Sequence, residues 1–380
     1  MKIKILATLI LTACGSLTAL AQSGPYVVPI YVDSATNYSP DRYTIYAGMS
    51  GGNSPNANIV AYNFDTGAPN MFSTLGGQGN TATGNFSFAQ GLTYNYYLDP
   101  VSVTLGDNTG NAIVSTGSGV NVASVVSITN GGNTSYTSNG PLGDNTYGDF
   151  GAGLYGNSTL ATILNQFPLA AGLQPGYVVN VAGVTSGNGT LTIGLSAAAI
   201  SAAENAPGAI IMPMSPSGFQ IPTTNGTLIN GYNKAQVANS TVTLTTSGTV
   251  SNPMPLVLDT GGGENVVIYS TSFGPDSSGN GTVNLSYNGQ TILQDTDTTP
   301  YGGNVDVVND ISGGTRINPG GAAIYENYQV MFVLSTNSSI DGEVILVPTT
   351  VPEPAESALV ALGACGVVGL LRRRMSSASA

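Results

Sequence analysis

The chain has 380 residues, a formal net charge of −12 and no His or Trp, and only 7% of its residues are charged. Without His, Ser-His-Asp and Cys-His catalysis and His-ligated zinc are excluded. Setting aside Glu353 and Glu356 leaves 20 − 2 = 18 acidic residues in the body, 22–350, against three basic ones (Arg42, Lys234 and Arg316), so the body carries 3 − 18 = −15. Nucleic acid and anionic lipid are therefore poor partners for it.

The composition predicts an all-β protein. The chain has 51 Gly, many β-branched residues and frequent Gly/Asn turns, a combination typical of short strands joined by tight turns. Its two cysteines, Cys14 and Cys365, both lie in terminal apolar segments, so the body has no disulfide or thiolate metal site. We expect no metal and no cofactor.

The N-terminus has the pattern of a signal peptide over residues 1–21. Lys2 and Lys4 form a basic region, an apolar run follows, and Ala19-Leu20-Ala21 is a small-residue cleavage site. An alternative is that Leu11-Thr12-Ala13-Cys14 is a lipobox with a lipidated cysteine. Both interpretations predict an exported protein.

The first part of the body alternates between apolar runs and turns. Strands are expected at 26–32 and 43–46, and the run 59–64 ends in Asp65-Thr66-Gly67. Aromatic residues between Phe86 and Tyr97 are expected to pack in the core or between lobes. Val101–Val114 reads as a β-hairpin with a Gly-Asp-Asn turn.

The middle of the chain contains two expected helices. Residues 158–167 have a hydroxyl cap and apolar residues at helical spacing, and the Ala-rich run 196–205 favours one or two helical turns. Strands are expected at 177–181 and 189–195, with a lobe boundary near residue 205. Strands at 237–249 then precede Asp259-Thr260-Gly261, and a further strand is expected at 328–332.

The two Asp-Thr-Gly turns form the candidate site. Each follows an apolar run and precedes another, and they lie 259 − 65 = 194 residues apart. Two carboxylates held about 3 Å apart cannot both ionise, so one keeps a proton while the other activates water. Each glycine lets the backbones approach, and Thr66 and Thr260 can brace the turns against each other.

Phe64-Asp65-Thr66-Gly67-Ala68-Pro69-Asn70 resembles the first catalytic turn of the pepsin-like aspartic proteases. The resemblance covers roughly residues 24–348 and implies an all-β, two-lobed fold with pseudo-two-fold symmetry and a few short helices. It divides the body into an N-terminal lobe, 22–205, and a C-terminal lobe, 206–350. Asp65 and Asp259 take the catalytic places, supported by Thr66, Gly67, Thr260 and Gly261.

The same resemblance implies a flap and two crossed loops. The flap falls on Leu105, Gly106 and Asp107, where Leu105 replaces the family's usual tyrosine. Gly156 and Gly320 take the places of the crossed-loop glycines, with Ala152-Gly153 as an alternative for the first. Ala68 and Gly262 stand where the family usually has Ser or Thr, although retroviral-type members carry Ala there.

The C-terminal segment, 351–380, resembles the bacterial PEP-CTERM sorting signal. It consists of Val351-Pro352-Glu353-Pro354, an apolar run over 358–371 and Arg372-Arg373-Arg374. The resemblance implies an exosortase-type sorting enzyme as a partner, membrane contact before processing, and a final location at the cell surface or outside the cell. A simple membrane anchor is the alternative.

The predicted function is that of an exported aspartic endopeptidase that hydrolyses peptide bonds with water activated between Asp65 and Asp259. Two alternatives remain open: a non-catalytic β-rich surface or matrix protein, and an inactive pepsin-like relative. The discriminating feature is whether the two turns meet in space.

Overall fold

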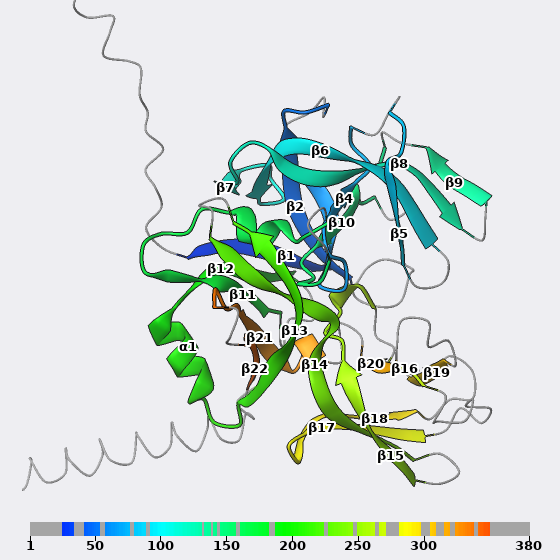
Figure 1. The fold of residues 1–380 in the computed structure, drawn as a ribbon, viewed down its shortest axis with the longest axis vertical. Helices are drawn as coiled ribbons and strands as arrows, with labels where there is room; N and C mark the ends of the chain where they lie inside the picture. The colour runs from blue at the N-terminus through cyan, green and yellow to red at the C-terminus, as the bar shows by residue number, and fades with distance from the viewer. Residues whose placement is uncertain are drawn as a thin grey trace, which may run out of the picture.

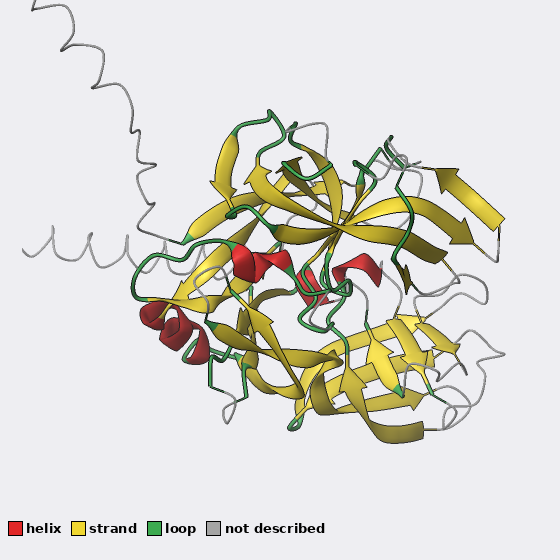
Figure 2. Ribbon diagram, turned by 45° about the horizontal axis from the view of Figure 1, so that its top comes forward, coloured by secondary structure: helices red, strands yellow, loops and turns green. Residues whose placement is uncertain are grey.

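The structure, a computed structural model, is almost entirely β and confirms the expected fold class (Figures 1 and 2). It describes residues 25–33, 42–53, 58–76, 80–88, 92–130, 133–137, 140–142, 145–156, 160–181, 187–223, 227–245, 249–262, 266–270, 281–297, 305–308, 315–319, 324–337 and 341–349. The predicted signal peptide and C-terminal sorting segment lie outside these ranges.

A central sheet of six antiparallel strands joins the two halves of the chain. Its order is β1–β12–β11–β21–β22–β13, so three strands from before residue 205 lie beside three strands from after it in one sheet. Its members are β1 (Tyr26–Asp33), β11 (Leu173–Asn180), β12 (Gly187–Ser196), β13 (Ile210–Pro222), β21 (Tyr328–Val333) and β22 (Glu343–Pro348). Stacking of Tyr177 on Phe332, with ring centroids 4.6 Å apart, joins β11 to β21 across the two halves.

The first lobe, at the top of Figure 1, is built around β2, β3, β6 and β8. β2 pairs with both β3 and β6, and β6 pairs along ten positions with β8. The strands are β2 (Arg42–Ser50), β3 (Val60–Asp65), β4 (Met71–Ser73), β5 (Gly84–Ser87), β6 (Leu92–Gly106), β7 (Ala112–Ser115), β8 (Val120–Asn130), β9 (Asn133–Thr137) and β10 (Gly148–Gly151).

The second lobe, at the bottom of Figure 1, is a second sheet centred on β14 that shares β13 with the central sheet. β14 pairs with β13, β15 and β17, and β17 pairs with β18. The strands are β14 (Leu228–Thr245), β15 (Thr249–Leu256), β16 (Val266–Tyr269), β17 (Gly281–Tyr287), β18 (Gln290–Asp297), β19 (Val305–Val308) and β20 (Arg316–Asn318).

The two lobes repeat one local arrangement around the Asp-Thr-Gly turns. In the first lobe, β10 lies parallel to β3, which enters the turn, and antiparallel to β4, which leaves it. In the second lobe, β20 lies parallel to β15 and antiparallel to β16 in the same way. Each turn is therefore enclosed by a later strand of its own lobe, which is the structural basis of the pseudo-two-fold symmetry.

One of the two predicted helices is confirmed, and the other is shorter than expected. Helix α1 (Ala197–Glu204) begins after Ser196, whose hydroxyl accepts a hydrogen bond from the Ala199 N–H. Within 160–167, the described part of the second predicted helix, the structure forms a 3-10 helix, Ile163–Gln166, capped by Thr162. Its three buried residues, Ile163, Leu164 and Asn165, pack against the lobe, so tertiary packing replaces the expected amphipathic α-helix.

The main hydrophobic core is continuous through both lobes and the central sheet. A smaller aromatic cluster surrounds Phe72 of β4, whose ring contacts the rings of Phe86, Phe88, Tyr94 and Tyr96. The predicted packing role of these aromatics is confirmed: they cover the strand that leaves the first Asp-Thr-Gly turn. None of the helices within the described ranges is both long and apolar enough to cross a membrane.

Candidate functional site at the junction of the two lobes

The structure brings the two Asp-Thr-Gly turns together. Asp65 is the last residue of β3 and is buried, with 7% of its surface exposed. Asp259 follows the buried residues Val257 and Leu258 and is half-buried, just before a 3-10 helix at Thr260–Gly262. Asp259 therefore keeps part of its surface open to solvent.

Hydrogen bonds from the two threonines join the turns reciprocally. The Thr66 N–H donates to Thr260 Oγ1, and the Thr260 N–H donates to Thr66 Oγ1, both over 2.9 Å. Each hydroxyl then donates across to the other lobe: Thr66 Oγ1 to Leu258 O over 2.8 Å, and Thr260 Oγ1 to Phe64 O over 2.7 Å. These are buried backbone and hydroxyl groups, so each bond fixes the spacing of the two turns as well as satisfying its own atoms.

The two glycines leave space for the opposite carboxylates. A Cβ at Gly67 would lie 2.3 Å from Cγ of Asp259, and a Cβ at Gly261 would lie 2.5 Å from Cγ of Asp65. Each carboxylate thus rests on the backbone of the other turn. A side chain at either position would occupy the place of a carboxyl group.

The surroundings of Asp65 favour its protonated form. Burial, the negative charges of Asp259 and Asp149, and a hydrogen bond with Asp259 raise the pKa of Asp65 well above its ordinary value. The Gly67 N–H, which donates to Asp65 Oδ1 over 2.6 Å, acts in the opposite direction. Asp65 therefore keeps its proton to a higher pH than an ordinary aspartate does.

Asp259 receives two donors. The Gly261 N–H donates to Oδ1 over 2.9 Å, and the Asn318 amide donates to Oδ2 over 2.8 Å. Asn318 comes from β20, the strand that encloses the second turn. Asn318 could not be identified from the sequence, because nothing in the segment Arg316–Pro319 indicates which residue faces Asp259.

Two tyrosines also contact the turns. The Tyr155 hydroxyl donates to Gly67 O over 2.6 Å, and the Tyr325 hydroxyl lies 3.2 Å from Thr66 Oγ1. Burial raises the pKa of Tyr155 well above its ordinary value; Asp65 and Asp259 add to the shift and Arg316 opposes it. Tyr155 therefore stays protonated, and its hydroxyl holds the first turn through Gly67 O.

The hairpin that was expected to act as a flap forms, but it packs against β1 and not over the two aspartates. It is the β6–β7 hairpin, and Leu105 is fully buried in the core. Asn108, after Gly106 and Asp107, donates its N–H to Tyr31 of β1. In Figure 1 β7 lies on the side of the first lobe opposite β5. The prediction that Leu105, Gly106 and Asp107 cover the aspartates is therefore not supported, because sequence order alone did not distinguish this hairpin from the β5–β6 hairpin.

The β5–β6 hairpin has a link to the site. Phe86 of β5 lies 6.5 Å, centroid to centroid, from Tyr155, the residue that donates to Gly67 O. Hydrogen bonding between Phe88 and Leu92 closes this hairpin, and residues 89–91 at its end lie outside the described ranges.

The glycines that let the chain cross beside the first turn are Gly151 and Gly153. A Cβ on Gly151 would lie 2.2 Å from Asn70 O, and one on Gly153 would lie 2.7 Å from Ala68 O. Gly156, which the family resemblance placed at the crossing, lies further along, where a Cβ would meet Leu160 O. The alternative, Ala152-Gly153, is therefore the crossing segment. Gly320 falls outside the described residues.

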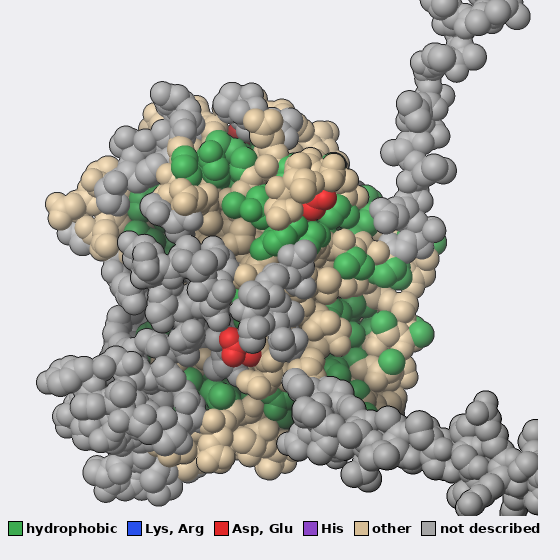
Figure 3. Space-filling view, turned by 180° about the vertical axis from the view of Figure 1, so that it is seen from behind, with side chains coloured by type: hydrophobic (Ala, Val, Ile, Leu, Met, Phe, Trp, Pro, Cys, Tyr) green, Lys and Arg blue, Asp and Glu red, His purple; other side chains and the backbone are tan. Residues whose placement is uncertain are grey.

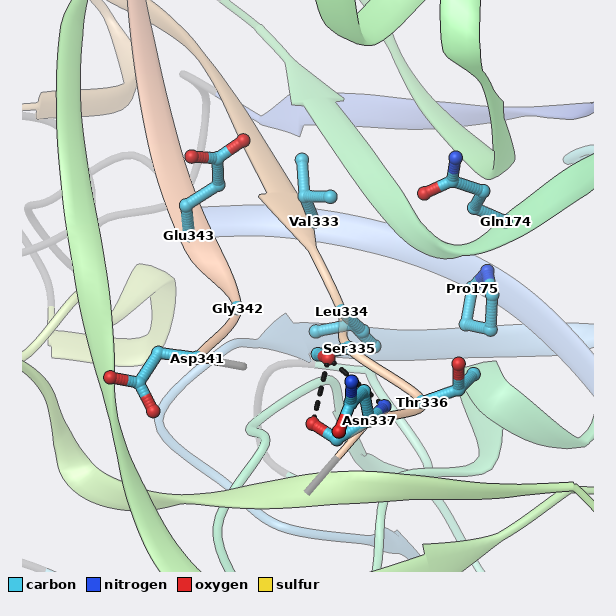
Figure 4. A pocket seen from close by; sticks show the side chains of 10 residues that line it. All are labelled: Gln174, Pro175, Val333, Leu334, Ser335, Thr336, Asn337, Asp341, Gly342 and Glu343. Atoms are coloured by element: carbon cyan, nitrogen blue, oxygen red, sulfur yellow. Dashed lines mark hydrogen bonds between the residues drawn. The ribbon is translucent and has the colours of Figure 1, made fainter. Parts of the chain in front are cut away.

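A separate hollow lies at the end of the β21–β22 hairpin (Figure 4). Its volume is about 410 Å³, and neither Asp65 nor Asp259 lines it. Its lining residues are Gln174, Pro175, Val333, Leu334, Ser335, Thr336, Asn337, Asp341, Gly342 and Glu343. Burial and the neighbouring Glu204 raise the pKa of Glu343. Among the described residues, no three Asp, Glu, Cys or His side chains are grouped as a metal site would require.

Comparison with known proteins identifies the fold. No protein-family model matches the chain, and no curated protein matches it in sequence. A crystal structure of an aspartic proteinase from Irpex lacteus matches with a TM-score of 0.50 and 14% sequence identity. The match covers 87% of this chain and 99% of the other. At 14% identity this likeness shows a pepsin-like fold and no more than the fold.

Proposed function

We propose that the protein is an aspartic endopeptidase that hydrolyses peptide bonds at the junction of its lobes. One observation carries this proposal: each carboxylate, Asp65 and Asp259, rests on the glycine of the opposite Asp-Thr-Gly turn. A fold with two unrelated turns has no reason to place two carboxyl groups so close, since their charges repel. The reciprocal threonine hydrogen bonds, Thr66 to Thr260, hold them there.

The roles of the two aspartates follow from their surroundings. Asp65 is buried beside negative charge and holds the shared proton; Asp259 is half-buried and accepts hydrogen bonds from Gly261 and Asn318, which stabilise its negative charge. Asp259 is then the general base and Asp65 the general acid.

In the reaction, Asp259 takes a proton from a water molecule as the water oxygen attacks the peptide carbonyl. Asp65 gives its proton to the carbonyl oxygen, so a neutral tetrahedral diol forms. Collapse of the diol breaks the C–N bond, the amine nitrogen takes the proton held by Asp259, and a hydroxyl proton returns to Asp65. One water is consumed and one carboxylic acid and one amine are produced.

The Asn318 amide replaces a missing hydroxyl in this scheme. Ala68 and Gly262 carry no hydroxyl near their aspartates, and Asn318 supplies a donor on the Asp259 side. A hydrogen bond to a charged group contributes about 1.5–3 kcal/mol, so Asn318 has a measurable effect on the pair.

The test is the rate of cleavage of denatured protein and synthetic peptides between acid and neutral pH. We expect a bell-shaped profile with its maximum in acid, because activity needs one proton on the pair. The alkaline limb should lie above the ordinary range of an aspartate, since burial raises the pKa of Asp65. Absence of cleavage at every pH would favour the alternative of a non-catalytic surface protein or an inactive relative.

Asn318→Leu should lower the pH–rate profile about tenfold at its maximum, because a hydrogen bond to a charged group contributes about 1.5–3 kcal/mol. Without the amide donor, the carboxylate of Asp259 loses one of the two hydrogen bonds that position it. Asn233→Leu, which changes an exposed amide on β14, is the matched control and should leave the profile unchanged. Equal profiles for both variants and the wild type would contradict the assigned role of Asn318.

Export is also part of the proposal. The basic and apolar segments at 1–21 and 351–374 support secretion and processing by an exosortase-type enzyme at the membrane. Mass spectrometry of the exported protein should find a chain without Arg372-Arg373-Arg374. A mature protein that retains this tail would contradict C-terminal processing.

A further inference from the structure

We propose that Tyr325 is a positioning residue for the catalytic pair: its hydroxyl donates to Thr66 Oγ1 and fixes the direction of the hydrogen bonds that join the two turns. This inference rests on the proposed function, because it concerns the geometry of Asp65 and Asp259. The Tyr325 side chain is fully buried, so it acts through Thr66 and has no contact with the substrate.

The partners of Thr66 Oγ1 give the direction of its hydrogen bond with Tyr325. A threonine hydroxyl has one hydrogen and two acceptor lone pairs. The hydrogen goes to Leu258 O over 2.8 Å, because a carbonyl oxygen can only accept, and the contact with Thr260 Oγ1 is longer at 3.4 Å. One lone pair accepts the Thr260 N–H over 2.9 Å. The Tyr325 hydroxyl, 3.2 Å away, therefore donates to the second lone pair, and Thr66 Oγ1 is then fully used.

The threonine of the second turn has a different set of partners. Thr260 Oγ1 donates to Phe64 O over 2.7 Å and accepts the Thr66 N–H over 2.9 Å. Within the described part of the chain, no tyrosine hydroxyl is bonded to Thr260 Oγ1. The tyrosine donor therefore breaks the pseudo-two-fold symmetry of the pair, and it does so on the side of Asp65, the neighbour of Thr66.

Tyr325 reaches the first turn from the chain that leads into the central sheet. It lies three residues before β21, and a hydrogen bond from the Asn327 N–H to Ile324 O closes the turn that carries it. Its ring packs edge-on to Tyr43 of β2, with ring centroids 6.4 Å apart. The buried ring has only two side-chain torsions, so the hydroxyl is held in one place. Thr66 is thus tied to the central sheet as well as to the second turn.

The Tyr325 hydroxyl keeps its proton wherever the enzyme is active. Burial raises the pKa of Tyr325 well above its ordinary value, and Asp259, Tyr43 and Asp65 add to the rise. The donor to Thr66 is therefore present from acid to neutral pH. Its removal should lower the pH–rate profile by the same factor at every pH and leave both limbs where they are.

Neutral hydrogen bonds of this kind suit a chain with few charges. Only 7% of the residues are charged, and on the face shown in Figure 3 the described side chains are mostly uncharged, with a few acidic ones and no basic ones. An ion pair needs both signs of charge, so this surface offers few of them. Salt screens charges but does not screen the neutral bond between Tyr325 and Thr66. We therefore expect the effect of removing it to be the same at low and high salt.

The experiment uses Tyr325→Phe, which removes one oxygen atom and keeps the ring. This variant should lower kcat for peptide cleavage about fivefold, the factor that one neutral hydrogen bond contributes. KM should stay unchanged, because the buried side chain does not bind the peptide. Tyr232→Phe is the matched control: Tyr232 is also fully buried, and its hydroxyl accepts the Ser335 N–H over 3.3 Å. Both variants should lose a comparable free energy of unfolding, and only Tyr325→Phe should lose kcat.

A fall in kcat in Tyr325→Phe alone supports the assigned role. An unchanged kcat in that variant, or an equal fall in both variants, overturns the inference and leaves the proposed function standing. If the wild type cleaves no peptide, the proposed function fails, and amide hydrogen exchange measured by NMR decides whether Tyr325 fixes the turns. The Thr260 N–H donates to Thr66 Oγ1, so it should exchange about fivefold faster in Tyr325→Phe than in Tyr232→Phe. Equal exchange rates in the two variants overturn the inference.

Discussion

Asp65→Asn and Asp259→Asn are each expected to lower kcat/KM for peptide cleavage by roughly a thousandfold, the range of one general acid–base group. In the first variant no proton can be given to the carbonyl oxygen, and in the second no carboxylate can accept one from water. Both effects should appear mainly in kcat, because neither carboxyl is needed to bind the remote parts of a peptide. The measurement is steady-state cleavage of a single fluorogenic peptide at the pH optimum.

The free energy of unfolding is the control measurement for these variants. The pKa of Asp65 is higher in the folded protein than its ordinary value, so ionisation of Asp65 opposes folding. Stability from this group is complete below the ordinary pKa and is lost as pH rises through the raised one. Asn does not titrate, so Asp65→Asn should have a free energy of unfolding at neutral pH at least equal to that of the wild type. Wild-type activity in either variant would remove the aspartates from the mechanism.

Gly67→Ala and Gly261→Ala are expected to disable the site and destabilise the protein together. The added Cβ would lie 2.3 Å from Cγ of Asp259 in the first variant and 2.5 Å from Cγ of Asp65 in the second, far inside van der Waals contact. The carboxylates cannot move freely, because Gly261 and Asn318 hold Asp259. The turns must therefore separate, which should cost about 1–3 kcal/mol of stability.

In both variants the loss of cleavage rate should exceed what the loss in unfolding free energy would explain. Displacing a reacting group by about 1 Å can reduce a rate by about 100-fold. Gly117→Ala is the matched control: Gly117 is exposed, and nothing lies within 4 Å of its added Cβ. It should change the unfolding free energy by less than about 0.5 kcal/mol. Chemical denaturation and peptide cleavage on the same three variants measure both effects, and similar results for all of them would show that the two turns do not meet in solution.

The local pattern of the sequence determined the elements and the two turns. Alternating apolar residues located β1, β2, β12 and β21, and the Ser196 hydroxyl before an Ala-rich run located α1. The two Asp-Thr-Gly turns were visible because strand, tight turn and strand are all encoded within about ten residues. The pairing of Thr66 with Thr260 followed from chemistry, since two matching turns with hydroxyls can brace each other.

Only the tertiary structure decided which distant residues join the site. The β6–β7 and β5–β6 hairpins have similar local signals. Pairing with β2, together with the hydrogen bond from Asn108 to Tyr31 of β1, turned the first of them away from the aspartates. Asn318 faces Asp259 because β20 lies parallel to β15 and antiparallel to β16. Strand alternation tells which side chains share a face but not which strand that face will meet. That choice depends on contacts between residues 59 positions apart along the chain, as for Asn318 and Asp259, and no local pattern encodes it.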